Sequence, residues 1–114
     1  MYRRYLLPHV ADMIDAMKYG FYHLDGIGAI PHLDALLGLK KLRAIQWVPG
    51  AGKEELSQWH DLIVHILTAK KSVEVFARPD EVGPLVKAVG TRGLLINVSC
   101  TAQEAEWLLE QRWQ

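Results

Sequence analysis

Residues 44–77 read AIQWVPGAGKEELSQWHDLIVHILTAKKSVEVFA, and they contain a complete strand–helix–strand unit. The first five residues form an apolar run that stops at the Pro-Gly-Ala-Gly sequence of residues 49–52, and residues 73–77 form a second such run. Between them, one stripe of a helix over residues 54–69 carries the apolar side chains of Leu56, Trp59, Leu62, Ile63, Ile66 and Leu67. Strands joined by a helix in this way run parallel with a right-handed crossover, so the segment predicts a βαβ unit.

The same alternation continues on both sides of this segment. The pattern predicts helices over 3–19, 30–38 and 80–89, strands over 21–25 and 94–98, and a last helix that begins at Thr101. One helix followed by four βα units predicts an α/β protein with parallel strands. No linker divides the chain, so we expect one structural unit over residues 1–114.

Two architectures accommodate this order of elements. One is a small open α/β sheet, and the other is half of a (βα)8 TIM barrel, which needs about 250 residues for its eight units. One face of the strands carries the polar residues Gln46, Glu74, Asn97 and Ser99, whereas the other face is apolar. This favours the half barrel, because strands buried on both faces are apolar almost throughout. We therefore expect either a missing N-terminal half barrel or a homo-oligomer to cover the polar face.

Composition narrows the class of protein. Thirteen basic and 13 acidic residues give a formal net charge of zero, so nothing favours a nucleic-acid or anionic-membrane partner. No segment approaches the roughly 18 consecutive apolar residues of a membrane span, and no signal peptide is recognisable. The single cysteine, Cys100, excludes an internal disulfide and fits a reducing compartment. We expect a cytoplasmic protein with a small-molecule substrate.

Candidate functional residues gather where the strands end, because the active sites of such folds lie at the carboxyl ends of parallel strands. His23 and Asp25 end the first predicted strand. The substrate-binding candidates follow from the later strands, and they are Gln46, Trp47, Arg78 and Asn97. Residues far apart in the sequence would thus meet at one rim.

His23 and Asp25 form the candidate catalytic pair. On a strand, residues two apart point to the same face, about 7 Å apart along the chain. The carboxylate can then orient the imidazole, or both side chains can bind one metal ion. With Cys100 they would make a three-ligand zinc site that leaves a fourth position open. The alternatives are a His23 that only hydrogen-bonds Asp25 in a barrel lumen, and a Cys100 that is a small buried hydrophobe.

A second His-Leu-Asp triplet at residues 32–34 has a different meaning. It falls on a predicted helix, where residues two apart face different directions, so His32 and Asp34 cannot act as a pair. The intervening Gly26-x-Gly28 lacks the third glycine of a dinucleotide-binding turn and the lysine of a P-loop. We interpret it as the sharp turn that leaves the first strand.

YHLDGIGAIPHLDALL at residues 22–37, AIQWVPGAG at 44–52 and the later strand that ends before Cys100 resemble the C-terminal half of the uroporphyrinogen decarboxylase-like superfamily. Within that superfamily, the chain is most similar to uncharacterised members related to the cobalamin-dependent methyltransferases. The resemblance implies the second half of a (βα)8 barrel. It also implies zinc, which in those methyltransferases binds a His-x-Cys at one strand end and a cysteine at a later one. His23 occupies the histidine position, Asp25 replaces the first cysteine, and Cys100 matches the second.

Three functional alternatives follow, the first two implied by the resemblance and the third by the open edges of a half barrel. In the first, zinc activates a thiol acceptor for methylation by a methyl-corrinoid carried on a partner protein, although Asp25 in place of cysteine makes the ion harder and puts thiol activation in question. In the second, the barrel is a metal-free decarboxylase of a tetrapyrrole carboxylate, with His23 and Arg78 binding or protonating the substrate. In the third, the chain is a non-catalytic half barrel that self-associates through its open sheet edges. The half barrel alone is expected to be inactive.

Overall fold

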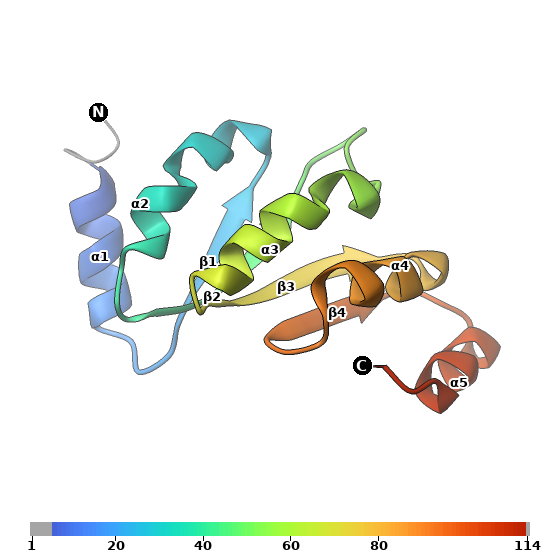
Figure 1. Cartoon of the computed structure of the whole chain (residues 1–114). Helices are drawn as coiled ribbons and strands as arrows, with labels where there is room; N and C mark the ends of the chain where they lie inside the picture. Colours follow the sequence, from blue (N-terminus) through green and yellow to red (C-terminus); the bar gives the residue numbers. More distant parts are fainter. Residues whose placement is uncertain (1–5, 114) are drawn as a thin grey trace.

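A computed structural model describes residues 6–113 and shows helices and strands in strict alternation (Figure 1). The strands are β1 (Gly20–Asp25), β2 (Leu42–Val48), β3 (Ser72–Ala77) and β4 (Leu94–Val98). The α-helices are α1 (Leu7–Asp15), α2 (Leu33–Leu37), α3 (His60–Thr68), α4 (Pro79–Val89) and α5 (Ala102–Glu110). Two short 3-10 helices, η2 (Ile27–His32) and η3 (Leu56–Trp59), precede α2 and α3.

The four strands form one sheet in the order β1-β2-β3-β4, and every neighbouring pair is parallel. The register places Tyr22 beside Ile45 and Gln46 beside Glu74. The α/β class and the parallel, alternating arrangement that the sequence predicted are thereby confirmed. Strand order follows chain order, so each crossover advances the sheet by one strand in the same direction.

One face of the sheet carries the core. Alternate residues of the strands, among them Leu24, Ile45 and Val73, are fully buried there against the apolar sides of the helices. In Figure 1, α3 and α4 lie in front of the sheet. Ile63, Ile66 and Leu85 of these two helices are fully buried in the same cluster. The apolar residues that alternate along the strands therefore pack against the apolar stripes of the helices, and together they form one core.

The other face of the sheet is open in the described part of the chain. It exposes Phe21 of β1, Phe76 of β3 and Leu95 of β4, whose relative exposures are 47%, 50% and 56%. The outer strands β1 and β4 each have a strand partner on one side only. We call this surface the open face, and it holds most of the candidate site residues.

Helix boundaries differ from the sequence prediction at three places. The helix expected over 30–38 is divided, because Pro31 has no backbone N–H to donate and the α-helical part begins only at Leu33. The helix expected over 54–69 begins with the 3-10 turn η3 and becomes α-helical at His60. Residues 3–5 of the first predicted helix lie outside the described residues, and α1 begins at Leu7. It ends at Asp15, four residues before the predicted end, and residues 16–19 form a turn and bend that lead into β1.

Candidate functional site

Four polar side chains, one from each strand, form a hydrogen-bonded row across the open face. His23 of β1 bonds through Nδ1 to the Oε1 atom of Gln46 of β2. The Nε2 atom of Gln46 donates to Oε1 of Glu74 of β3 over 3.0 Å, and Nδ2 of Asn97 of β4 donates to the other oxygen of Glu74. We call His23, Gln46, Glu74 and Asn97 the polar row.

The strand register explains why these residues meet. His23 lies directly beside Gln46, and Gln46 lies directly beside Glu74, so their side chains leave the sheet at neighbouring points of the same face. Asn97 is paired with Phe76, two residues beyond Glu74 on the same face, and reaches Glu74 diagonally. Glu74 is therefore the residue that joins the last two strands to the first two.

The direction of the hydrogen bonds assigns a proton to His23. A carboxylate only accepts, so Glu74 must receive the amide NH2 of Gln46, which turns the amide oxygen of Gln46 toward the imidazole. That oxygen also only accepts, so Nδ1 of His23 carries the proton. In a neutral imidazole, Nε2 is then unprotonated and available as a base.

Asp25 extends the row toward the carboxyl end of β1. Its Oδ2 atom lies 3.8 Å from Nε2 of His23, and the two side chains are 67% and 55% exposed. This distance makes the carboxylate an electrostatic partner of a protonated His23 rather than a firm hydrogen-bond acceptor. Nε2 thus faces solvent beside a negative charge, as a proton donor and acceptor would.

The expected zinc ligands are not assembled. Among residues 6–113, no three His, Cys, Asp or Glu side chains are grouped closely enough to hold a metal ion. Cys100 is exposed and follows β4, whereas His23 and Asp25 are on β1, at the opposite edge of the sheet. Three strand spacings, about 14 Å in total, separate the edges. These residues therefore do not fit a three-ligand zinc site.

Arg78 follows β3, but it is directed to helix α4 rather than to the polar row. Its Nε donates to Oδ1 of Asp80 over 3.2 Å, and its NH2 group lies 3.8 Å from Oε2 of Glu81. The hydrogen bond to Asp80, aided by the charges of both carboxylates, raises the pKa of Arg78. The same bond lowers the pKa of Asp80. Arg78 is thus held in the first turn of α4.

Trp47 lies on the helix-covered face, opposite to its neighbour Gln46. Only 1% of its surface is exposed, and its ring meets that of Trp59 edge-to-face with centroids 5.1 Å apart. It also borders an apolar cavity of about 380 Å³ at the carboxyl ends of β2 and β3, beneath the loop at residues 49–51. Trp47 is therefore placed beside a cavity at the expected end of the sheet, but not within the polar row.

Two further residues complete the comparison with the sequence expectations. Asp34 of the second His-Leu-Asp triplet accepts a bond from His65 of α3 at 2.7 Å, so it joins α2 to α3. Glu74 was predicted to lie on the polar face but was not among the expected site residues. A charged residue between the buried Val73 and Val75 was the signal that could have identified it.

Compared with known proteins, the chain matches no family model, no curated protein and no solved structure. Within the described residues, no helix has the length and apolar character needed to cross a membrane.

Proposed function

We propose that the chain is the C-terminal half of a (βα)8 barrel and that the polar row lines the lumen of the complete barrel. In this function the row binds a small polar substrate and His23 transfers a proton, without a metal. The observation that carries the proposal is the polar row itself, which spans all four strands on the face that no described helix covers.

The strand order supports the half barrel over a doubly wound sheet. Right-handed crossovers that advance in one direction place every helix on the same face, as in a barrel. A doubly wound sheet reverses its strand order at a switch point and carries helices on both faces. Here the order is sequential and the described helices pack on one face only. Four further βα units would pair with β1 and β4 and enclose the open face.

The chemistry that fits the row is proton transfer. Glu74 orients Gln46, Gln46 orients His23, and the Nε2 atom of His23 is left to act on the substrate, the arrangement in which a base is positioned by supporting groups. The resemblance to the metal-free branch of the uroporphyrinogen decarboxylase-like superfamily suggests that the reaction is a decarboxylation. The carbon–carboxylate bond of a carboxylated tetrapyrrole breaks, CO2 leaves with the carboxyl carbon, and a protonated His23 gives its proton to the carbon that remains. Asp25 stabilises the protonated imidazole before transfer.

The zinc-dependent, corrinoid-linked alternative has less support. It requires Cys100 beside His23, whereas the two residues belong to opposite edges of the sheet. Nε2 of His23 could bind an ion beside Asp25, but no third His, Cys, Asp or Glu side chain of residues 6–113 joins them. We derive no step through a metal for these reasons.

The proposed function is tested with His23→Gln in the barrel completed by its amino-terminal half. Decarboxylation of a porphyrinogen carboxylate should slow by about a hundredfold or more, the usual contribution of a general acid or base. His9→Gln, on an exposed position of α1, is the matched control and should leave the rate unchanged. Equal rates for the two variants would refute the role of His23. Stoichiometric zinc that is lost on His23→Gln would instead favour the metal-dependent alternative.

A further inference from the structure

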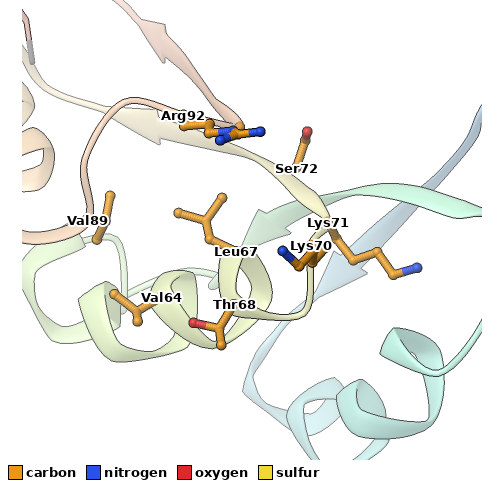
Figure 2. A pocket seen from close by; sticks show the side chains of 9 residues that line it. Val64, Leu67, Thr68, Lys70, Lys71, Ser72, Val89 and Arg92 are labelled. Carbon is orange, nitrogen blue, oxygen red and sulfur yellow. The ribbon is translucent and has the colours of Figure 1, made fainter.

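A second cavity lies at the opposite end of the sheet from the carboxyl ends of the strands. Its volume is about 650 Å³, and its walls come from the end of α3, the start of β3 and the loop that leads into β4. Its lining includes Leu67, Thr68, Lys70, Ser72 and Arg92 (Figure 2). It shares no lining residue with the polar row.

The cavity is strongly cationic. Lys70, Lys71 and Arg92 line it, and no acidic residue does. The side chains of Lys70 and Arg92 form no hydrogen bond or ion pair with any described residue, so both charges are available to a ligand. Nζ of Lys71 donates to the carbonyl of Leu39 over 2.8 Å and points away from Lys70 and Arg92 in Figure 2. Lys71 therefore makes the electrostatic potential of the cavity more positive, but its ammonium group does not contact a ligand there.

The surroundings of Lys71 also disfavour its charged form. Partial burial, together with the nearby charge of Arg43, lowers the pKa of Lys71. A bound anion would offset this repulsion between cations. The basic cluster is thus more favourable with an anion present than without one.

The remaining lining suits an anion attached to a less polar group. The hydroxyls of Thr68 and Ser72 are hydrogen-bond donors, whereas Val64, Leu67 and Val89 form an apolar wall. A planar guanidinium binds two phosphate oxygens at once, and an ammonium adds a point charge. The volume exceeds that of a lone inorganic ion and fits a small organic molecule.

Lys70 has a backbone conformation that glycine would adopt more readily. It follows the end of α3 with φ of 67°, the one non-glycine residue with positive φ among residues 6–113. Its N–H bonds to the carbonyl of Leu67, and the N–H of Lys71 bonds to that of Ile66, which together make a Schellman motif. Glycine is the usual residue at this position. A lysine there places an ammonium group at the cavity despite the backbone strain.

We propose that this cavity binds a phosphate-bearing small molecule. Arg92 holds the phosphate oxygens, Lys70 neutralises their charge, and Thr68 and Ser72 supply hydroxyl donors, while the apolar wall receives the organic part. The proposal is independent of the function assigned to the polar row. A nucleic acid is disfavoured, because the chain has 13 basic and 13 acidic residues and the cations gather around one open cavity rather than along a stripe.

Calorimetric titration with pyrophosphate, at low ionic strength and without divalent ions, tests the proposal. Arg92→Gln and Lys70→Gly should each raise the Kd for pyrophosphate about tenfold or more, since each removes a charged donor to the ligand. Lys70→Gly is the informative variant, because glycine accepts the positive φ and the protein should remain as stable as the wild type. Lys87→Gln, on an exposed position of α4, is the matched control and should bind like the wild type.

Three outcomes would overturn the proposal. The first is no binding of pyrophosphate by the wild type at millimolar concentration. The second is a Kd that agrees within about twofold between both cavity variants and Lys87→Gln, which would indicate diffuse attraction to surface cations. The third is binding of a single-stranded oligonucleotide that pyrophosphate does not displace and that Arg92→Gln weakens, which would assign the cations to a nucleic acid.

Discussion

The junction between α1 and β1 depends on the absence of a side chain at Gly20. A methyl group there would lie 2.7 Å from Cγ2 of Ile14 and 3.0 Å from the carbonyl oxygen of Lys41. Ile14 is buried, and Lys41 contributes backbone, so neither contact can be relieved easily. Gly20→Ala should therefore lower the free energy of unfolding by about 1–3 kcal/mol, as overpacking commonly does. Urea denaturation followed by circular dichroism measures this change.

Gly28→Ala is the control for that substitution. No atom lies within 4 Å of a methyl group at Gly28, and its φ is not positive. Alanine should be neutral there or should stabilise the protein by up to about 1 kcal/mol through a less flexible unfolded chain. Equal destabilisation by Gly20→Ala and Gly28→Ala would show that backbone freedom, and not steric contact, explains both glycines.

At the scale of elements, Glu81 joins helix α4 to the 3-10 turn η3. Its Oε1 accepts the N–H of Arg78 over 2.8 Å, and its Oε2 accepts the N–H of Leu56 over 2.7 Å. Its side chain is only 10% exposed. Glu81→Gln presents an NH2 group to one of these N–H donors, and it should cost about 1–3 kcal/mol of unfolding free energy. Thermal or urea unfolding measures the loss.

Glu104→Gln provides the comparison at another helix start. Glu104 accepts one N–H, that of Thr101, in an exposed capping box of α5. Its replacement by glutamine keeps an acceptor oxygen, so the cost should be less than about 1 kcal/mol. A loss as large as that of Glu81→Gln would mean that the contact between Glu81 and Leu56 contributes nothing.

The same elements show how far the sequence alone could predict the fold. All four strands lie where apolar runs placed them, because a strand is recognised from local alternation over a few residues. The start of the third predicted helix was wrong because it depends on a distant residue. The N–H of Leu56 is bonded to Glu81, 25 positions away, and no local pattern contains that contact.

The candidate site was predictable to a similar extent. Parity along the strands predicted that Gln46, Glu74 and Asn97 share a face. That Glu74 bridges the other two follows from the register between strands, which local pattern does not specify. Arg78 was expected at the rim, but its carboxylate neighbours Asp80 and Glu81 hold it at α4. The pairing of Arg78 with carboxylates two and three residues away could have been predicted more safely than a contact with another strand.

At the scale of the whole molecule, the open face predicts self-association of the 114-residue chain. Phe21, Phe76 and Leu95 are exposed there between two unpaired strand edges. Such a surface favours pairing with another chain. Sedimentation velocity at micromolar concentrations should show oligomers, and Leu95→Lys should shift the population toward monomers because a charge resists burial.

Leu109→Lys is the matched control for this prediction. Leu109 is 86% exposed on α5, on the helix side of the sheet, so a lysine there should leave the oligomer population unchanged. A compact monomer in the wild type, stable across the concentration range, would contradict the need for a covered face and with it the half barrel. An equal effect of both lysines would indicate nonspecific apolar association.

The four tryptophans form two separate edge-to-face pairs, so intrinsic tryptophan fluorescence can report on two different parts of the protein. Trp47 is buried against Trp59 with its indole N–H unbonded, in an environment that shifts tryptophan emission to the blue. Trp107, 54% exposed and paired with Trp113, emits from a more aqueous site at the end of the chain. If Trp107 and Trp113 were replaced by phenylalanine, the remaining tryptophan fluorescence would come only from Trp47 and Trp59. The helix-covered layer of the sheet could then be observed without a label, separately from α5.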